Sequence, residues 1–244
     1  MKNSSTIRAE ARAALAVNGT YWLYFGGILV LGLVVGVAIA AFIGLFAATA
    51  VVAGSLGIAY PATLGEIFSS PAALALTCTV SLAATVLFLY TLGFARWSQS
   101  AMELAASRGG LRFGHAFSGW GNGWRMTWIM LVYTTFLQLW SLLLFVPGII
   151  KAFSYALTPF VAIDHPDWGA CQCITESRRL MRGNKWRLFK LLFSFIGWLL
   201  LVVMLSLVPF VGNIAPYLLE PYLGTAFARF YEDVLDEDES KGRQ

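Results

Sequence analysis

The chain has 244 residues, of which 58% are hydrophobic and only 12% are charged. A soluble domain carries about 25% charged residues, so this composition excludes an ordinary soluble protein and indicates an integral membrane protein. The formal net charge of +4 gives no indication of nucleic acid as a partner. The three cysteines, Cys78, Cys171 and Cys173, are odd in number and lack a paired spacing, so no disulfide framework is predicted.

In chain order, the apolar segments predict an all-α, polytopic membrane helical bundle in a single domain over residues 1–234. About 20 apolar residues are needed to cross the hydrocarbon of a bilayer. The first apolar run is too long for a signal peptide, so we expect it to be a retained span. Pro216 and Pro221 interrupt the last segment. The six expected spans cover residues 21–53, 71–94, 124–145, 148–163, 186–208 and 214–231, followed by an acidic and polar cytosolic tail over 235–244.

The basic residues decide how these spans are arranged. All but one of the 17 Lys and Arg residues fall in four clusters: before the first span, between the second and third, around the start of the fifth, and at the end of the chain. Loops rich in Lys and Arg stay on the cytoplasmic side. A turn at Pro147-Gly148 places all four clusters on that side, whereas one long helix over residues 124–163 does not. We therefore expect three hairpins with both termini cytosolic, Lys151 near the outer end of the fourth span, and Glu66 in an outer loop.

A short sequence recurs where apolar segments begin. "GNGWRMT" covers residues 121–127 and "GNKWRLF" covers residues 183–189, while "NGTYW" at 18–22 is a looser copy. Asn can accept hydrogen bonds from the first amides of a helix, Trp favours the headgroup level, and Arg reaches anionic phosphate. The pattern predicts an anchor at the cytosolic surface, either purely structural or a functional site for lipid or a partner protein. Its expected residues are Asn122, Trp124, Arg125, Arg179, Arg182, Asn184, Lys185, Trp186 and Arg187.

An amphipathic helix is predicted just before the second copy. Asp167 can cap a helix that runs to about Arg182, and Gly183 fits the left-handed position after its last turn. Such a helix lies in the membrane interface with its basic side among the headgroups. Its apolar face would hold Trp168, Cys171, Ile174, Ser177 and Met181, and its polar face Gln172, Thr175, Glu176, Arg179 and Arg182.

Few side chains are candidates for an intramembrane ion pair, a metal site or catalysis. Lys151 and Glu220 form a possible intramembrane ion pair; alternatively, Glu220 caps a short interfacial helix that starts at Pro221. The acidic end, residues 232–240, is expected to be a solvated tail, or else to fold back on the basic cluster around Arg182. No nucleophile or phosphate-binding motif is present, so neither an enzyme nor a cofactor is predicted. Five metal-capable side chains match no zinc spacing, so no metal is expected: Asp164, His165, Asp167, Cys171 and Cys173.

Three stretches in the second half of the chain carry a family resemblance. They are "LWSLLLFVPGIIKAFSYALTPFVAIDHPD" (139–167), "ESRRLMRGNKWRLFKLLFSFIGWLLL" (176–201) and "PYLGTAFARFYEDV" (221–234). Together they closely resemble the bacterial membrane family catalogued as domain of unknown function 975. The two cysteines in "GACQC" (169–173) depart from the pattern. The resemblance implies a multi-pass protein of the bacterial inner membrane and no established activity.

Two functional hypotheses follow from these features. The basic amphipathic stretches and aromatic anchors favour a non-enzymatic module that binds anionic lipid headgroups at the cytosolic face, or a partner membrane protein. The Pro-broken segments favour a transporter or channel for a small apolar or peptide-like solute instead, since discontinuous helices often line binding sites. A central cavity lined by Lys151, Glu220, Gln138 and Asn213 is expected only for transport.

Overall fold

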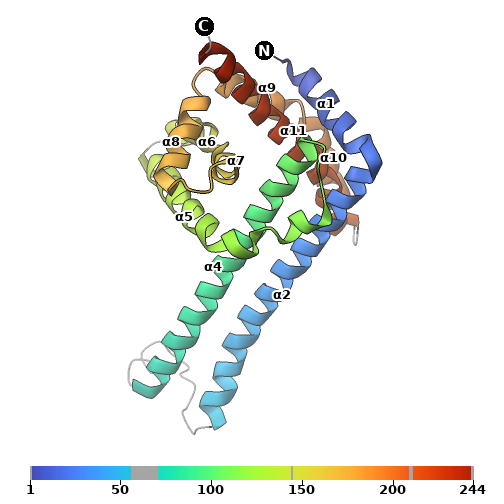
Figure 1. Ribbon diagram of the computed structural model, residues 1–244. Coiled ribbons are helices and arrows are strands. Elements are labelled where there is room, and N and C mark those ends of the chain that lie inside the picture. The colour runs from blue at the N-terminus through green and yellow to red at the C-terminus, as the bar shows by residue number, and fades with distance from the viewer. Residues whose placement is uncertain (1, 56–70, 144, 209–210, 243–244) are drawn as a thin grey trace. The chain divides into compact units, whose positions relative to one another are not determined.

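The computed structural model describes residues 2–55, 71–143, 145–208 and 211–242, and every regular element in them is a helix (Figure 1). The chain divides into two compact units, one of Gly32–Leu92 and one of Met1–Leu31 with Gly93–Gln244. The elements are α1 (Ser4–Ala16), η1 (Val17–Gly19), α2 (Thr20–Ser55), α4 (Pro71–Ser107), η2 (Phe113–Phe117), α5 (Gly119–Leu143), α6 (Phe145–Tyr155), α7 (Thr158–Asp164), α8 (Ala170–Leu180), α9 (Lys185–Phe193), α10 (Ile196–Leu205) and α11 (Val211–Gly242).

Two helices in the described part of the chain are long and apolar enough to cross a membrane. These segments are Thr20–Leu45 of α2 and Cys78–Ser107 of α4, and α9 with α10 makes a third if this pair, bent by 43°, is one span. Helices also occupy the other predicted positions, but the fourth segment is broken into α6 and α7. The chain is therefore all-helical with two or three candidate spans, and the six-span arrangement stays a prediction.

The second helix is longer than the sequence suggested. We expected the second span to end at Phe94, but α4 continues to Ser107. Residues 95–107 contain neither Gly nor Pro and are rich in helix-forming Ala, Met, Leu, Gln and Glu. The helix that begins as an apolar span therefore also contains charged side chains near its C-terminal end.

The smaller unit contains the C-terminal part of α2 and the N-terminal part of α4. Its helices are linked by a ring contact between Phe42 and Phe88, with centroids 5.7 Å apart. Large aliphatic side chains, among them Leu33, Ile43 and Leu82, are exposed on both helices, as a surface facing lipid requires. Glu66 and the outer loop that holds it lie outside the described residues.

Helices α5 and α6–α7 form an antiparallel pair. A Cβ at Gly148 would lie 3.0 Å from Cα of Ser141, and the rings of Tyr133 and Tyr155 are in contact. Pro147 lies in the first turn of α6, where a missing N–H costs nothing. Pro147 and Gly148, where a turn was expected, therefore lie inside α6. Helix α8 packs against both legs of this pair.

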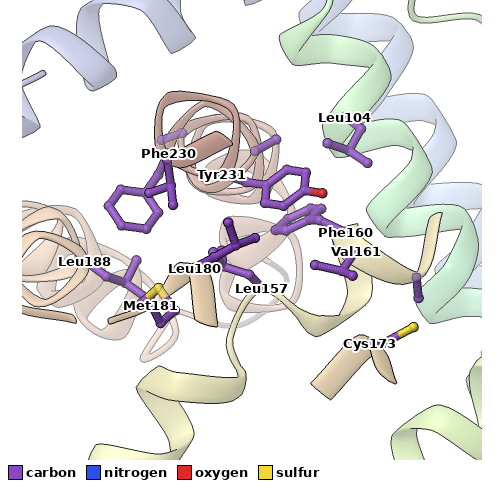
Figure 2. Packing of buried hydrophobic residues seen from close by; sticks show 14 of the residues in the cluster. Leu104, Leu157, Phe160, Val161, Cys173, Leu180, Met181, Leu188, Phe230 and Tyr231 are labelled. Carbon is purple, nitrogen blue, oxygen red and sulfur yellow. The ribbon is translucent and has the colours of Figure 1, made fainter. Parts of the chain in front are cut away.

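The core of the larger unit lies between α7, α8, α9 and α11. Phe160 stacks on Tyr231 with ring centroids 5.5 Å apart, and both side chains are buried. Figure 2 shows how this pair meets the side chains of neighbouring helices, with Leu157, Leu180, Met181, Leu188 and Phe230 around it. The core brings together helices that are far apart in the sequence. Their packing determines on which side of each helix the charged residues lie.

The C-terminal helix differs from the prediction in extent. We expected a span to Tyr231 and then a solvated tail over 235–244, but α11 is continuous from Val211 to Gly242. It packs against α1, and Figure 1 shows the C-terminal part of α11, in red, near α1, in blue. Val234 is buried beyond the expected end of the span. The described part of the predicted tail, residues 235–242, is therefore helical, and Asp236, Glu239, Ser240 and Lys241 in it are exposed.

The close approach of α4 and α5 can be tested at Gly93. A Cβ at Gly93 would lie 2.2 Å from the backbone oxygen of Gly123 and 2.0 Å from Oγ1 of Thr127, whereas Gly121 has open space. We expect Gly93→Ala to lower the free energy of unfolding by at least about 1–3 kcal/mol, the usual effect of overpacking. Gly121→Ala is the matched control and should have little effect. Unfolding in detergent measures both, and equal losses would contradict the packing.

Candidate functional site

The predicted amphipathic helix exists, with different ends and a different buried face. Helix α8 begins at Ala170 rather than after Asp167, and Gly169 N donates to Oε1 of Gln172 at 2.8 Å. Cys171 is exposed and Cys173 is buried, so the prediction that Cys171 lies on the apolar face is wrong. Burial raises the pKa of the Cys173 thiol. Gly183 has φ +82°, which confirms its left-handed position.

The recurring Gly-Asn-x-Trp-Arg sequence does not form one recurring structure. At the second copy Asn184 precedes α9, but its amide donates to the carbonyl of Leu180 at 3.0 Å and its Oδ1 accepts from Arg187 at 2.9 Å. The prediction that Asn184 caps the amides of α9 is therefore wrong. At the first copy α5 has already begun at Gly119, so Asn122 lies inside its first turn. The amide of Gly119 donates to Oγ of Ser98 at 3.0 Å.

The aromatic residues of the predicted anchor are exposed. Trp124 and Trp186 have more than half of their surface accessible, and Trp120 and Trp128 on the same helix as Trp124 are also exposed. Trp186 stacks on Phe189 with ring centroids 4.9 Å apart. These indole rings are available to the headgroup region of a bilayer, where Trp is enriched.

Arg125 makes contacts within the protein instead of presenting a free cation. Its guanidinium donates to the carbonyls of Ala162 at 2.8 Å, His165 at 2.9 Å and Trp168 at 2.8 Å. These carbonyls lie at the end of α7 and in the turn that follows, and they carry the negative end of the helix dipole. Arg125 thus fastens α5 to the α7–α8 connection, which corrects its expected role at lipid phosphate.

Arg187 is held by the acidic part of α11. It is bonded to the carboxylates of Asp233 and Glu237, and only 16% of its side chain is exposed. The expectation that Arg187 reaches lipid phosphate is wrong, because its guanidinium is already bonded to two carboxylates. Of the two alternatives for the acidic end, the one in which it folds back on the basic cluster is the one observed.

Two further arginines are held in the same way. Arg179 donates to Glu176 at 2.6 Å and to Asp238 at 2.7 Å. This contact raises the pKa of Arg179 and lowers the pKa of Asp238. Arg108 donates to both carboxylate oxygens of Asp164 and to Glu232, and the hydrogen bonds that it donates to Asp164 raise the pKa of Arg108. The acids of α11 therefore bind arginines of α8, of α9 and of the turn that follows α4.

Lys151 has different neighbours from those predicted. Its ammonium lies 4.2 Å from the centre of the Trp140 ring, while Glu220 accepts a hydrogen bond from Gln99. The predicted Lys151–Glu220 pair is therefore not formed. Lys151 instead shares a pocket of about 260 Å³ with Arg178, and the charge of Lys185 also acts on it. Arg182, the remaining basic residue of the predicted anchor, is exposed.

The pocket that holds Lys151 lies between α5, α6 and α8. Among the described residues that line it, Lys151 and Arg178 are basic and none is acidic. The remaining lining is mainly aromatic or apolar, with Phe136, Trp140, Tyr155, Ile174, Cys171 and Thr175. Two cations beside aromatic walls form a site for an anionic group attached to an apolar body.

Lys151 and Gln138, two of the residues expected to line a transport cavity, line different pockets. Gln138 lines a separate pocket of about 560 Å³ with Thr135 and Ser141. Lys151 lines the pocket described above, and Glu220 is bonded to Gln99. The side chain of Asn213 lies outside the described residues.

One buried polar group was not predicted from the sequence. Arg96, Gln99 and Glu103 follow one another at helical spacing on the extension of α4, and they lie with Glu220 and Tyr24 inside the larger unit. The i, i+3, i+7 spacing could have identified this polar face. It was overlooked because the span was expected to end at Phe94.

The chain belongs to the family described as "Protein of unknown function (DUF975)", whose sequence profile matches residues 74–238. The match confirms the resemblance and extends it to the second apolar helix. No curated protein and no solved structure matches the chain.

The bonds between Arg187 and the acidic residues of α11 can be tested by substitution of Arg187. Arg187→Ala leaves Asp233 buried without its partner, so we expect a loss of about 3 kcal/mol in the free energy of unfolding. Arg182→Ala removes an exposed cation from the same basic stretch and should change stability by less than about 0.5 kcal/mol. Unfolding in detergent gives both values. Losses of the same size would show that the pair does not hold α11.

Proposed function

We propose that this protein is a non-enzymatic membrane module that binds anionic phospholipid at the cytosolic face, through the pocket between α5, α6 and α8. The observation that carries the proposal is an excess of positive charge. Lys151 and Arg178 both line the pocket. Like charges repel, so an anion that bridges them is favoured. A phosphate supplies that anion through charge-assisted hydrogen bonds.

The nearby acidic residues do not neutralise the pocket, because they are bonded to arginines outside it. Glu176, on the same helix as Arg178, is bonded to Arg179. Asp233 and Glu237 of α11 are bonded to Arg187. The cations of the pocket are therefore left for a ligand. Each Lys or Arg near an anionic membrane surface contributes about 1 kcal/mol to binding.

The walls of the pocket favour a lipid over a free phosphate. Trp140 and Phe136 stand beside Lys151, and α5 continues as an exposed apolar surface that includes Leu131, Leu139 and Leu142. A headgroup at the cations would leave its acyl chains along this surface. Trp rings at the edge of such a site match the headgroup level of a bilayer.

The same pocket supports a topology with both termini in the cytosol and α2 and α4 crossing the inner membrane of a bacterium. Six crossings would put Lys151 on the outer side and Arg178 on the inner side, although the two residues line one pocket. An α5–α6 hairpin that lies along the cytosolic interface, with α8 packed on both legs, would keep the two residues on one side.

The proposal predicts selective loss of lipid in a variant without the two pocket cations. We expect Lys151→Gln combined with Arg178→Gln to weaken binding of phosphatidylglycerol by roughly 30-fold, since two cations at about 1 kcal/mol each give this ratio. Native mass spectrometry of the full chain in detergent measures retention of phosphatidylglycerol against phosphatidylcholine with the same acyl chains.

The matched control removes two exposed cations elsewhere, Arg112→Gln with Lys241→Gln, and should keep the preference for the anionic lipid. Equal retention by the two double variants would overturn the proposal. Equal retention of the two lipids by the unaltered chain would also overturn it. Binding of inorganic phosphate as tightly as lipid would assign the pocket to a free anion instead.

A further inference from the structure

A second charge imbalance, of opposite sign, lies inside the larger unit. Arg96, Gln99 and Glu103 share one face of α4, Glu220 stands on α11, and Tyr24 comes from the start of α2. Glu103 is only 3% exposed. Three helices from distant parts of the sequence thus meet around a buried carboxylate.

The described charges of this group do not balance. Nη1 of Arg96 is 3.7 Å from Oε1 of Glu103, beyond the length of a good hydrogen bond. Glu220 accepts its hydrogen bond from the neutral amide of Gln99. Glu103, Glu220 and Arg96 are the charged groups that act on Tyr24. When both carboxyl groups are ionised, two carboxylates share one guanidinium, and one negative charge is in excess where an unpaired charge is costly.

The hydroxyl of Tyr24 is directed into this group and has no partner. Tyr24 is fully buried, and its Oη makes no hydrogen bond with the described residues. A Cβ at Gly224 would lie 2.8 Å from Oη of Tyr24 and 2.8 Å from Cγ of Glu103. The hydroxyl and the carboxyl group therefore converge on the backbone of α11, at a residue that has no side chain. A buried hydroxyl left unpaired costs about 1–3 kcal/mol, so a ligand for its oxygen is favoured.

We propose that this group binds one monovalent cation, held by the carboxylate of Glu103 and the hydroxyl oxygen of Tyr24. Carboxylate and hydroxyl oxygens are hard ligands, which suit alkali cations. The charge selects the valence, because one positive charge neutralises the site whereas a divalent ion would leave it positive. The bound ion would join α2, α4 and α11, and it is independent of the lipid pocket.

The test is the salt dependence of unfolding for the purified full chain in detergent. Chloride salts of sodium, potassium and N-methylglucamine are compared at one pH and one ionic strength. We expect the Tm to rise and saturate with one of the alkali cations, because a ligand that binds only the folded state stabilises it by mass action. N-methylglucamine is too large for the site and should give no rise.

Variants assign the effect to the proposed ligands. Glu103→Gln should abolish the cation-dependent rise in Tm. Tyr24→Phe keeps the ring and removes only the oxygen, so the concentration that gives half of the rise should increase about tenfold, as expected for about 1.4 kcal/mol. Tyr21→Phe is the matched control, because the Tyr21 hydroxyl already donates to the carbonyl of Leu218 at 2.8 Å. It should leave the cation dependence unchanged.

Three results would overturn the cation site: the same Tm in all three salts, the same cation dependence in Glu103→Gln, or a rise in Tm at lower pH that is identical in all salts and lost in Glu103→Gln. The last result would mean that a proton, and not a metal cation, neutralises the site. Because the lipid-pocket variant Lys151→Gln with Arg178→Gln leaves Glu103 intact, it should keep the full cation response, so failure of one proposal is distinguishable from failure of the other.

Discussion

The bond between Arg187 and the carboxylates of α11 is the interaction on which the other charges of the larger unit depend. It joins the start of α9 to Asp233 and Glu237, and it is largely withdrawn from solvent. Because α11 is held at this point, Glu232 reaches Arg108 and Asp238 reaches Arg179. The acidic end of the chain therefore supplies carboxylate partners for Arg108, Arg179 and Arg187.

This pairing defines the places where the protein is not neutral. Lys151 and Arg178 share a pocket whose described lining has no acid, whereas Glu103 and Glu220 share one guanidinium. In both places the charge that the chain lacks is the charge a ligand would bring. The first site opens to an apolar helix surface and suits an anionic lipid, and the second is buried and suits a small cation. The two proposals thus rest on the same accounting of charge but on different residues.

The sequence was sufficient for features that depend on local chemistry. The long apolar run of α2, the exposed Trp186 and the left-handed Gly183 follow from composition and from neighbouring residues. It was insufficient for the partners of arginines. The carbonyls that bind Arg125 come from a turn some 40 residues later, and Asp233 comes from the far end of the chain. The two copies of the Gly-Asn-x-Trp-Arg sequence also adopt different structures. Asn184 precedes its helix, whereas Asn122 lies within one. The face of Arg96, Gln99 and Glu103 was visible in principle, but only once α4 was continued beyond Phe94.

The central claim is that Lys151 lies at the same membrane surface as Arg178. It is tested most directly with a chain in which Cys78, Cys171 and Cys173 are replaced by Ser and a single Cys is placed at Lys151 or, as a reference, at Arg182. Each protein is exposed to a membrane-impermeant maleimide in sealed vesicles of either orientation. We expect Lys151→Cys and Arg182→Cys to react in inside-out vesicles and to be protected in right-side-out ones. Reaction of Lys151→Cys only from the outer side, with Arg182→Cys reacting only from the inner side, would contradict the shared pocket and the account built on it.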